Sequence, residues 1–109
     1  GDILLNLDSE DEGELYIGCA GGVNTNGDMK YNEEDVPAGM AAYQIAVKGL
    51  KGGHSGLDIN LGRGNSNKII NALLVTAAEK FGLRVAGMEG GNLRNAIPRE
   101  AFAAVVVPE

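Results

Sequence analysis

The chain has 109 residues, of which 44% are hydrophobic, and its nine basic and fifteen acidic side chains give a formal net charge of −6. No apolar run approaches the roughly 18 residues that a membrane-spanning helix needs, so the composition favours a water-soluble globular domain or part of one and argues against a membrane partner. The acidic balance, the absence of a basic stripe and the single cysteine argue against a nucleic-acid partner and against an internal disulfide, as expected in the cytoplasm.

The first 40 residues predict two short strands and a linker. "DILLNL" (2–7) is an apolar run typical of a buried strand, an acidic loop follows, and "ELYIGCAGG" (14–22) predicts a second strand. Residues 23–39 mix polar residues, Asn-Gly and Pro, which is turn chemistry and indicates a linker between domains. Because an apolar strand lies almost at each end of the chain, we expect the sheets to continue into neighbouring structure, so that this chain is a fragment.

The rest of the chain predicts a small α+β domain. "AYQIAVKGL" (42–50) alternates apolar and polar residues and predicts a strand with one buried face. Apolar residues recur at helical spacing in "NSNKIINALLVTAAEKFG" (65–82), with Asn or Ser near Asn65 to cap its start and Gly82 to end it. "LRVAGMEGG" (83–91) and "AFAAVVV" (101–107) predict two more strands. The order strand, helix, strand, strand is the first part of a split β-α-β motif whose second half is missing.

Asp8 is the first candidate site residue. It leaves the end of a predicted buried strand, where α/β proteins often place oxygen ligands for divalent metals. The alternative is a solvated acidic loop, since Ser9, Glu10 and further acidic residues follow. No EF-hand, HExxH or CxxC pattern is present. Asp8 and one distant histidine cannot complete a zinc coordination shell by themselves.

His54, the only histidine, is the second candidate. It lies in the glycine-rich stretch "LKGGHSGLDI" (50–59), where the small residues let the backbone approach another molecule closely. An imidazole here, with a helix N-terminus about ten residues on, could hold an anion or an oxyanion. A surface turn residue without a further role is the alternative.

The stretch "GGNLRNAIP" (90–98) also has two possible interpretations. It could be an ordinary polar turn, or it could present the Asn95 amide and the Arg94 guanidinium to a carboxylate or carbonyl. The glycines of "GRGN" also invite an anion-binding interpretation for the helix start at 62–68, although no phosphate-loop pattern is present. Cys19 is interpreted as a small buried hydrophobe, because no second histidine exists to activate it.

Three long segments carry a family resemblance. "LLNLDSEDEGELYIGCAGG", "GLKGGHSGLDINLGRGNSNKIINALL" and "GGNLRNAIPREAFA", in this order, resemble the Xaa-His (aminoacyl-histidine) dipeptidases. These belong to the larger aminoacylase and carboxypeptidase family of dinuclear zinc metallopeptidases. The resemblance implies an α/β catalytic domain that holds two divalent metal ions, with zinc expected first and manganese or cobalt as alternatives. It also implies an inserted lid domain of ferredoxin-like α+β fold, with a helix on one face of an antiparallel sheet.

The resemblance also implies roles for the three candidates. Asp8 corresponds to a carboxylate ligand of one metal, His54 to the lid histidine that stabilises the tetrahedral oxyanion, and Asn95 to the lid asparagine that contacts the substrate. Residues 1–22 would be closing strands of the catalytic domain, 23–39 a linker, and 40–109 the first half of the lid or dimerisation domain. The remaining metal ligands and the general base have no match here, so the parent is expected to be a cytoplasmic Xaa-His dipeptidase and this chain alone to be inactive.

Three alternatives stay open. The first is a non-catalytic lid-like module that forms a homodimer through an apolar sheet edge made by "AFAAVVV". The second is another enzyme of the same family, such as a tripeptidase or an aminoacylase. The third is an anion-binding module that uses the helix start at 62–68.

Overall fold

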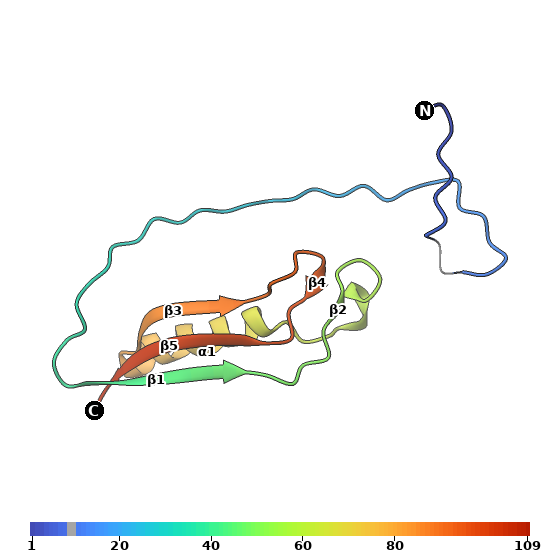
Figure 1. The fold of residues 1–109 in the computed structure, drawn as a ribbon. Helices are drawn as coiled ribbons and strands as arrows, with labels where there is room; N and C mark the ends of the chain where they lie inside the picture. Colours follow the sequence, from blue (N-terminus) through green and yellow to red (C-terminus); the bar gives the residue numbers. More distant parts are fainter. Residues whose placement is uncertain (9–10) are drawn as a thin grey trace. The chain divides into compact units, whose positions relative to one another are not determined.

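The computed structural model describes residues 1–8 and 11–109, which form two compact units, Gly1–Asn32 and Glu33–Glu109. Within these residues the helices and strands all lie in the second unit (Figure 1). In chain order they are β1 (Met40–Val47), β2 (Gly53–His54), a 3-10 helix (Ile59–Leu61), α1 (Ser66–Phe81), β3 (Arg84–Gly90), β4 (Ala96–Ile97) and β5 (Ala101–Pro108). None of the described helices is long and apolar enough to cross a lipid bilayer.

Three strands form an antiparallel sheet in the order β1-β5-β3, and α1 lies along one face of it (Figure 1). The register pairs Val105 of β5 with Tyr43 of β1 and with Val85 of β3. This arrangement confirms the predicted α+β fold and the order strand, helix, strand, strand. It corrects one expectation, because "AFAAVVV" forms the central strand and therefore offers no free edge. The edges of this sheet are β1 and β3.

The core lies between α1 and the facing side of β5. Ala101, Ala103 and Val105 are at most 2% exposed, because alternate residues of a strand point to the same face. Ile70 and Leu74, one helical turn apart on α1, pack against them together with Leu83. Burial of this apolar surface holds the helix on the sheet.

Both predicted ends of the helix are confirmed. The Asn65 side chain accepts a hydrogen bond from the Lys68 N–H at 3.1 Å, which satisfies one of the free amide groups of the first turn. Gly82 follows the last helical residue with φ of 66°, a left-handed conformation that glycine adopts without strain.

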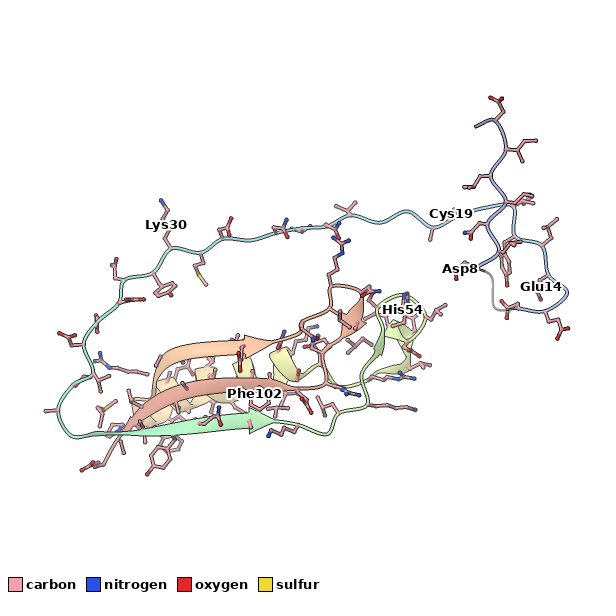
Figure 2. The ribbon with its side chains drawn as sticks, viewed as in Figure 1. Asp8, Glu14, Cys19, Lys30, His54 and Phe102 are labelled. Atoms are coloured by element: carbon pink, nitrogen blue, oxygen red, sulfur yellow. The ribbon has the colours of Figure 1, made fainter. Side chains whose placement is uncertain are left out.

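The two strands expected at the N-terminus are not formed in the described residues 1–8 and 11–39. Ile3, Leu5 and Ile17 are 83%, 82% and 97% exposed. A strand needs a neighbour to accept its backbone hydrogen bonds, and the described part of this unit supplies none. Cys19 is exposed as well, so its interpretation as a buried hydrophobe was wrong (Figure 2).

Candidate functional site

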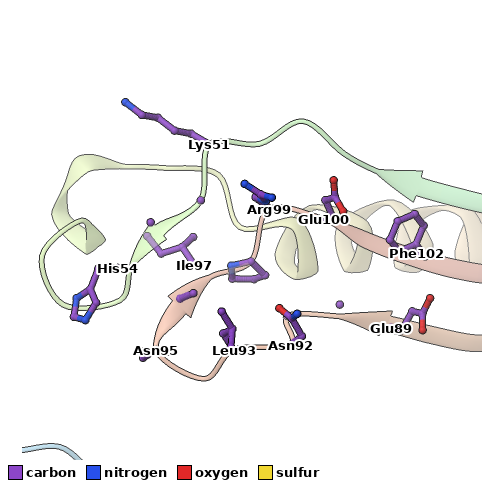
Figure 3. Close-up of a pocket in the computed structure, with 16 residues that line it drawn as sticks. Lys51, His54, Glu89, Asn92, Leu93, Asn95, Ile97, Arg99, Glu100 and Phe102 are labelled. Atoms are coloured by element: carbon purple, nitrogen blue, oxygen red, sulfur yellow. The ribbon is translucent and has the colours of Figure 1, made fainter.

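A second, two-stranded sheet brings the two candidate residues of the glycine-rich loops together. Strands β2 and β4 are antiparallel, with His54 opposite Ala96. The Ser55 N–H donates a hydrogen bond to the Asn95 carbonyl oxygen at 3.0 Å. His54 and Asn95, far apart in the sequence, therefore lie side by side at one end of the domain (Figure 3).

These residues border a pocket of about 900 Å³ between the small sheet and the ends of β3 and β5 (Figure 3). Its wall carries the basic residues Lys51 and Arg99 and the acidic residues Glu89 and Glu100, as well as His54 and Asn95. Phe102 adds an aromatic surface, and the Lys48 ammonium lies 5.0 Å from the centre of that ring. The pocket thus combines hydrogen-bond donors, side chains of both charges and an apolar surface, which suits a small polar molecule with charged ends.

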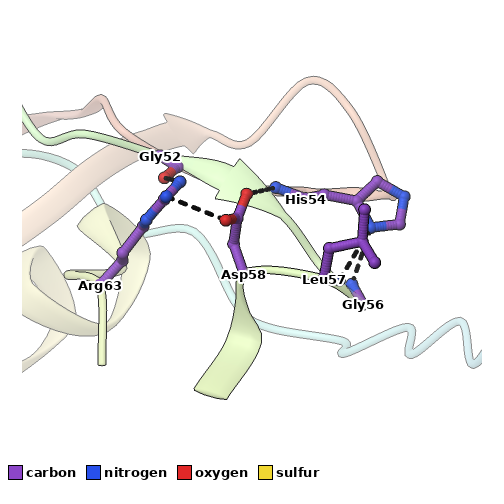
Figure 4. Close-up of polar contacts among 6 residues, drawn as sticks. All are labelled: Gly52, His54, Gly56, Leu57, Asp58 and Arg63. Carbon is purple, nitrogen blue, oxygen red and sulfur yellow. Dashed lines mark hydrogen bonds and ion pairs between the residues drawn. The ribbon is translucent and has the colours of Figure 1, made fainter. Parts of the chain in front are cut away.

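The His54 ring is held by the turn that follows it. Its Nδ1 atom accepts hydrogen bonds from the N–H groups of Gly56 and Leu57, each at 3.1 Å (Figure 4). The ring itself is exposed to solvent. The turn therefore orients the imidazole through Nδ1 and leaves Nε2 available to another molecule.

Asp58 and Arg63 brace the same turn, and the sequence reasoning missed both. The Asp58 carboxylate accepts the His54 N–H at 2.7 Å and forms an ion pair with Arg63 at 2.9 Å (Figure 4). Arg63 also donates to the Gly52 carbonyl oxygen at 2.7 Å. The two side chains are only 25% and 18% exposed, so the pair is partly shielded from water. The close spacing of an acid and a base after "GGHSG" was the only signal that could have indicated them.

Gly53 shows why this stretch contains glycine. Its φ is 152°, and a Cβ atom there would lie 2.6 Å from an Asp58 carboxylate oxygen and would also overlap the Arg63 guanidinium. Only a residue without a side chain leaves room for the ion pair against the backbone next to His54.

Asp8 lies in the unit Gly1–Asn32 and is described there by itself. It is exposed, and its N–H donates to the Asn6 side-chain oxygen at 3.1 Å. Ser9 and Glu10, part of the predicted acidic loop, lie outside the described residues. Among residues 1–8 and 11–109, no three His, Cys, Asp or Glu side chains gather closely enough to hold a metal ion. The described residues therefore do not form a metal centre by themselves.

The start of α1, the proposed anion site at 62–68, already uses several of its amide groups. The Ser66 N–H donates to the Pro98 carbonyl oxygen at 2.9 Å, and the Lys68 N–H is taken by the Asn65 cap. An anion at this helix start would have to compete with these bonds.

Comparison with known proteins shows which family and which enzymes this chain resembles. Residues 45–108 match the family model of the peptidase dimerisation domain. The cytosol non-specific dipeptidase of Escherichia coli (strain K12) is 52% identical over 106 residues, which are 97% of this chain and 22% of that protein. The crystal structure of an aminoacylhistidine dipeptidase from Vibrio alginolyticus is similar with a TM-score of 0.66 and 53% identity, over 69% of this chain and 15% of that one.

The chain therefore spans about a fifth of the length of the curated relative that it matches. Similarity to a dipeptidase of this kind confirms the resemblance carried by the three long segments. The matched region runs from within β1 to the end of β5 and so includes both His54 and Asn95. The chain belongs to the peptidase dimerisation domain family.

Proposed function

We propose that this chain is part of a cytoplasmic, metal-dependent dipeptidase, in which residues 40–109 are the first half of a lid over the substrate. The observation that carries the proposal is the pairing of β2 with β4, which sets His54 beside Asn95 at the edge of a pocket with basic residues. The two relatives are both named as dipeptidases, which supports the same reaction class.

His54 would act through Nε2. When water attacks the peptide carbonyl, negative charge develops on its oxygen, and a donor already in place stabilises the transition state more than the substrate. The Asn95 amide would donate to the substrate carboxylate or to the same carbonyl. Lys51 and Arg99, which share the pocket wall with Glu89 and Glu100, would be the groups that pair with the carboxylate end of a dipeptide.

The metal belongs to the rest of the parent enzyme in this proposal. Asp8 would contribute one carboxylate to one of two divalent ions, zinc first and manganese or cobalt as alternatives. The described residues do not assemble three metal ligands, and in this proposal further ligands would come from the rest of the parent chain. Residues 1–22 would be closing strands of the catalytic domain, which form their sheet only against that domain, and residues 23–39 the linker. The 109-residue chain alone would then be inactive.

The partners of the parent would be a dipeptide and, through this domain, a second copy. The family description supports dimerisation. Since β5 is central, a homodimer formed through the sheet would have to use the β1 or the β3 edge.

The test is kcat/KM of the full-length parent on a Xaa-His dipeptide, for wild type, His54→Ala and Asn95→Ala. Loss of one oxyanion donor is expected to lower kcat by about 10²- to 10³-fold with metal content unchanged. Asn71→Ala, the same chemical change as Asn95→Ala at an exposed position of α1, is the matched control and should change little. A His54→Ala enzyme with wild-type activity would return His54 to the role of a turn residue.

The breadth of specificity needs its own assay, because one relative is named non-specific and the other is named for aminoacyl-histidine. A panel of dipeptides, tripeptides and acylated amino acids would separate a dipeptidase from a tripeptidase or an aminoacylase. Faster turnover of tripeptides or of acylated amino acids would contradict the proposal.

A further inference from the structure

The hydrogen bonds to the His54 ring fix which of its nitrogens carries the proton. Backbone N–H groups can only donate, and two of them, from Gly56 and Leu57, point at Nδ1 at 3.1 Å. Nδ1 must therefore present its lone pair. In the neutral ring the proton then lies on Nε2, so the exposed nitrogen is a donor and has no lone pair to offer.

Asp58 closes the turn that supplies these two amides, because both its backbone and its side chain bond to the backbone of His54. The Asp58 N–H donates to the His54 carbonyl oxygen at 3.0 Å, and the Asp58 carboxylate accepts the His54 N–H at 2.7 Å. Arg63 holds that carboxylate in place and is itself anchored on the Gly52 carbonyl oxygen. The backbone on each side of His54 is thus tied to one ion pair (Figure 4).

We infer that Asp58 and Arg63 are positioning residues, which lock the turn 54–58 and so hold His54 as an Nε2–H donor at the edge of the pocket. The ring would bind groups that accept a hydrogen bond, such as a carbonyl oxygen or an oxyanion. It would be a poor metal ligand or general base, because both roles need a free lone pair on the exposed nitrogen. The inference rests on the proposed function only for the identity of the acceptor.

The first test is an NMR measurement on the 109-residue chain, in which His54 supplies the only imidazole signal. Long-range ¹H–¹⁵N spectra of the ring report the position of the proton, and amide exchange reports the bonds from Gly56 and Leu57. Wild type should show Nε2–H with both amides protected. Asp58→Ala should lower the protection of both amides by about tenfold or more, because their hydrogen bonds then open readily. The tautomer ratio should move toward that of a free histidine.

The matched control is Arg84→Ala, which breaks the other ion pair of this unit, a 2.7 Å contact with Glu34 whose side chains are mostly exposed. It should leave the ring spectrum and both amides unchanged. If Asp58→Ala unfolds α1, as judged by circular dichroism, Asp58→Asn and Arg63→Lys keep the size or the charge and are measured instead. A proton on Nδ1 in wild type would overturn the inference. So would unchanged amide protection in folded Asp58→Asn and Arg63→Ala variants.

Activity of the parent separates this inference from the proposed function. Asp58→Ala and Arg63→Ala should lower kcat by about tenfold or more while KM and metal content change little, and Arg63→Lys should restore part of the loss. Wild-type activity in His54→Ala would refute the catalytic role while leaving the NMR result intact. An inactive His54→Ala together with fully active Asp58 and Arg63 variants would refute the positioning role alone.

Discussion

Gly53→Ala is expected to destabilise the unit Glu33–Glu109 strongly, although it adds one methyl group. The new Cβ would lie 2.6 Å from an Asp58 carboxylate oxygen and 2.8 Å from the Asp58 Cβ, and would overlap the Arg63 guanidinium. The ion pair would have to move away, which would weaken its bonds to the His54 N–H and the Gly52 carbonyl oxygen.

The expected loss of unfolding free energy in Gly53→Ala can be worked out from the backbone strain and the weakened hydrogen bonds. The strained positive φ of this position costs a non-glycine residue about 1–3 kcal/mol, and loss of a hydrogen bond to a charged group costs about 1.5–3 kcal/mol. Together they predict a loss of about 2.5–6 kcal/mol. The whole unit is expected to be stable by only about 4–12 kcal/mol, at 0.05–0.15 kcal/mol per residue. The substitution should therefore lower Tm by more than about 10 °C.

The assay is thermal and urea unfolding followed by circular dichroism of α1. Gly87→Ala is the matched control, because a Cβ at Gly87 would have no atom within 4 Å and its φ needs no glycine. We expect it to change the unfolding free energy by no more than about 0.5 kcal/mol. If Gly53→Ala were within 1 kcal/mol of wild type by the same measurement, the packing argument at the His54 turn would be refuted.

Two further predictions concern the core and the N-terminal unit. Ile70→Ala should lower the unfolding free energy by about 2–5 kcal/mol, because Ile70 is fully buried against β5; a loss similar to that of Val75→Ala, an exposed position of α1, would contradict this core. The pKa of Tyr16 is raised from its usual 10.0 by hydrogen bonds to the carboxylates of Asp11 and Glu14. The neutral phenol donates these hydrogen bonds. They are therefore present at a pH below the ordinary tyrosine pKa, and they are lost as the pH rises through the raised pKa of Tyr16. The measurement is phenolate absorbance of Tyr16 in a variant whose other tyrosines are replaced by phenylalanine. Asp11→Asn should lower the pKa of Tyr16 in this background. An unchanged pKa would refute the hydrogen bond between Tyr16 and Asp11.

The parts of the fold that the sequence predicted are those with a regular period. The helix between Asn65 and Gly82 and the three long strands follow from apolar spacing and from caps, which act locally. The strands expected at 2–7 and 14–22 were not found, because an apolar run indicates burial without saying whether its partner is in the same chain. The place of β5 in the middle of the sheet depends on which strands pair, which the order of elements alone left open.

The candidate site was predicted only in part. His54 and Asn95 were singled out by their surroundings and by resemblance, and the structure brings them together. The sheet that does so has two residues per strand, too short for any periodic signal. The bond between Asp58 and Arg63 was also missed, because it forms only once the turn after His54 has folded.

The central position of β5 also determines when this sheet can form. Both ladders of the three-stranded sheet use β5, and the β1 ladder joins Met40 to Pro108. Because β5 follows β1 and β3 in the chain, these two strands stay unpaired during synthesis until β5 has emerged from the ribosome. Such long-range pairing folds slowly and leaves apolar strands open to wrong partners in the meantime. A nascent chain stalled before Ala101 should therefore hold α1 as no more than a transient helix and should be a target for chaperones.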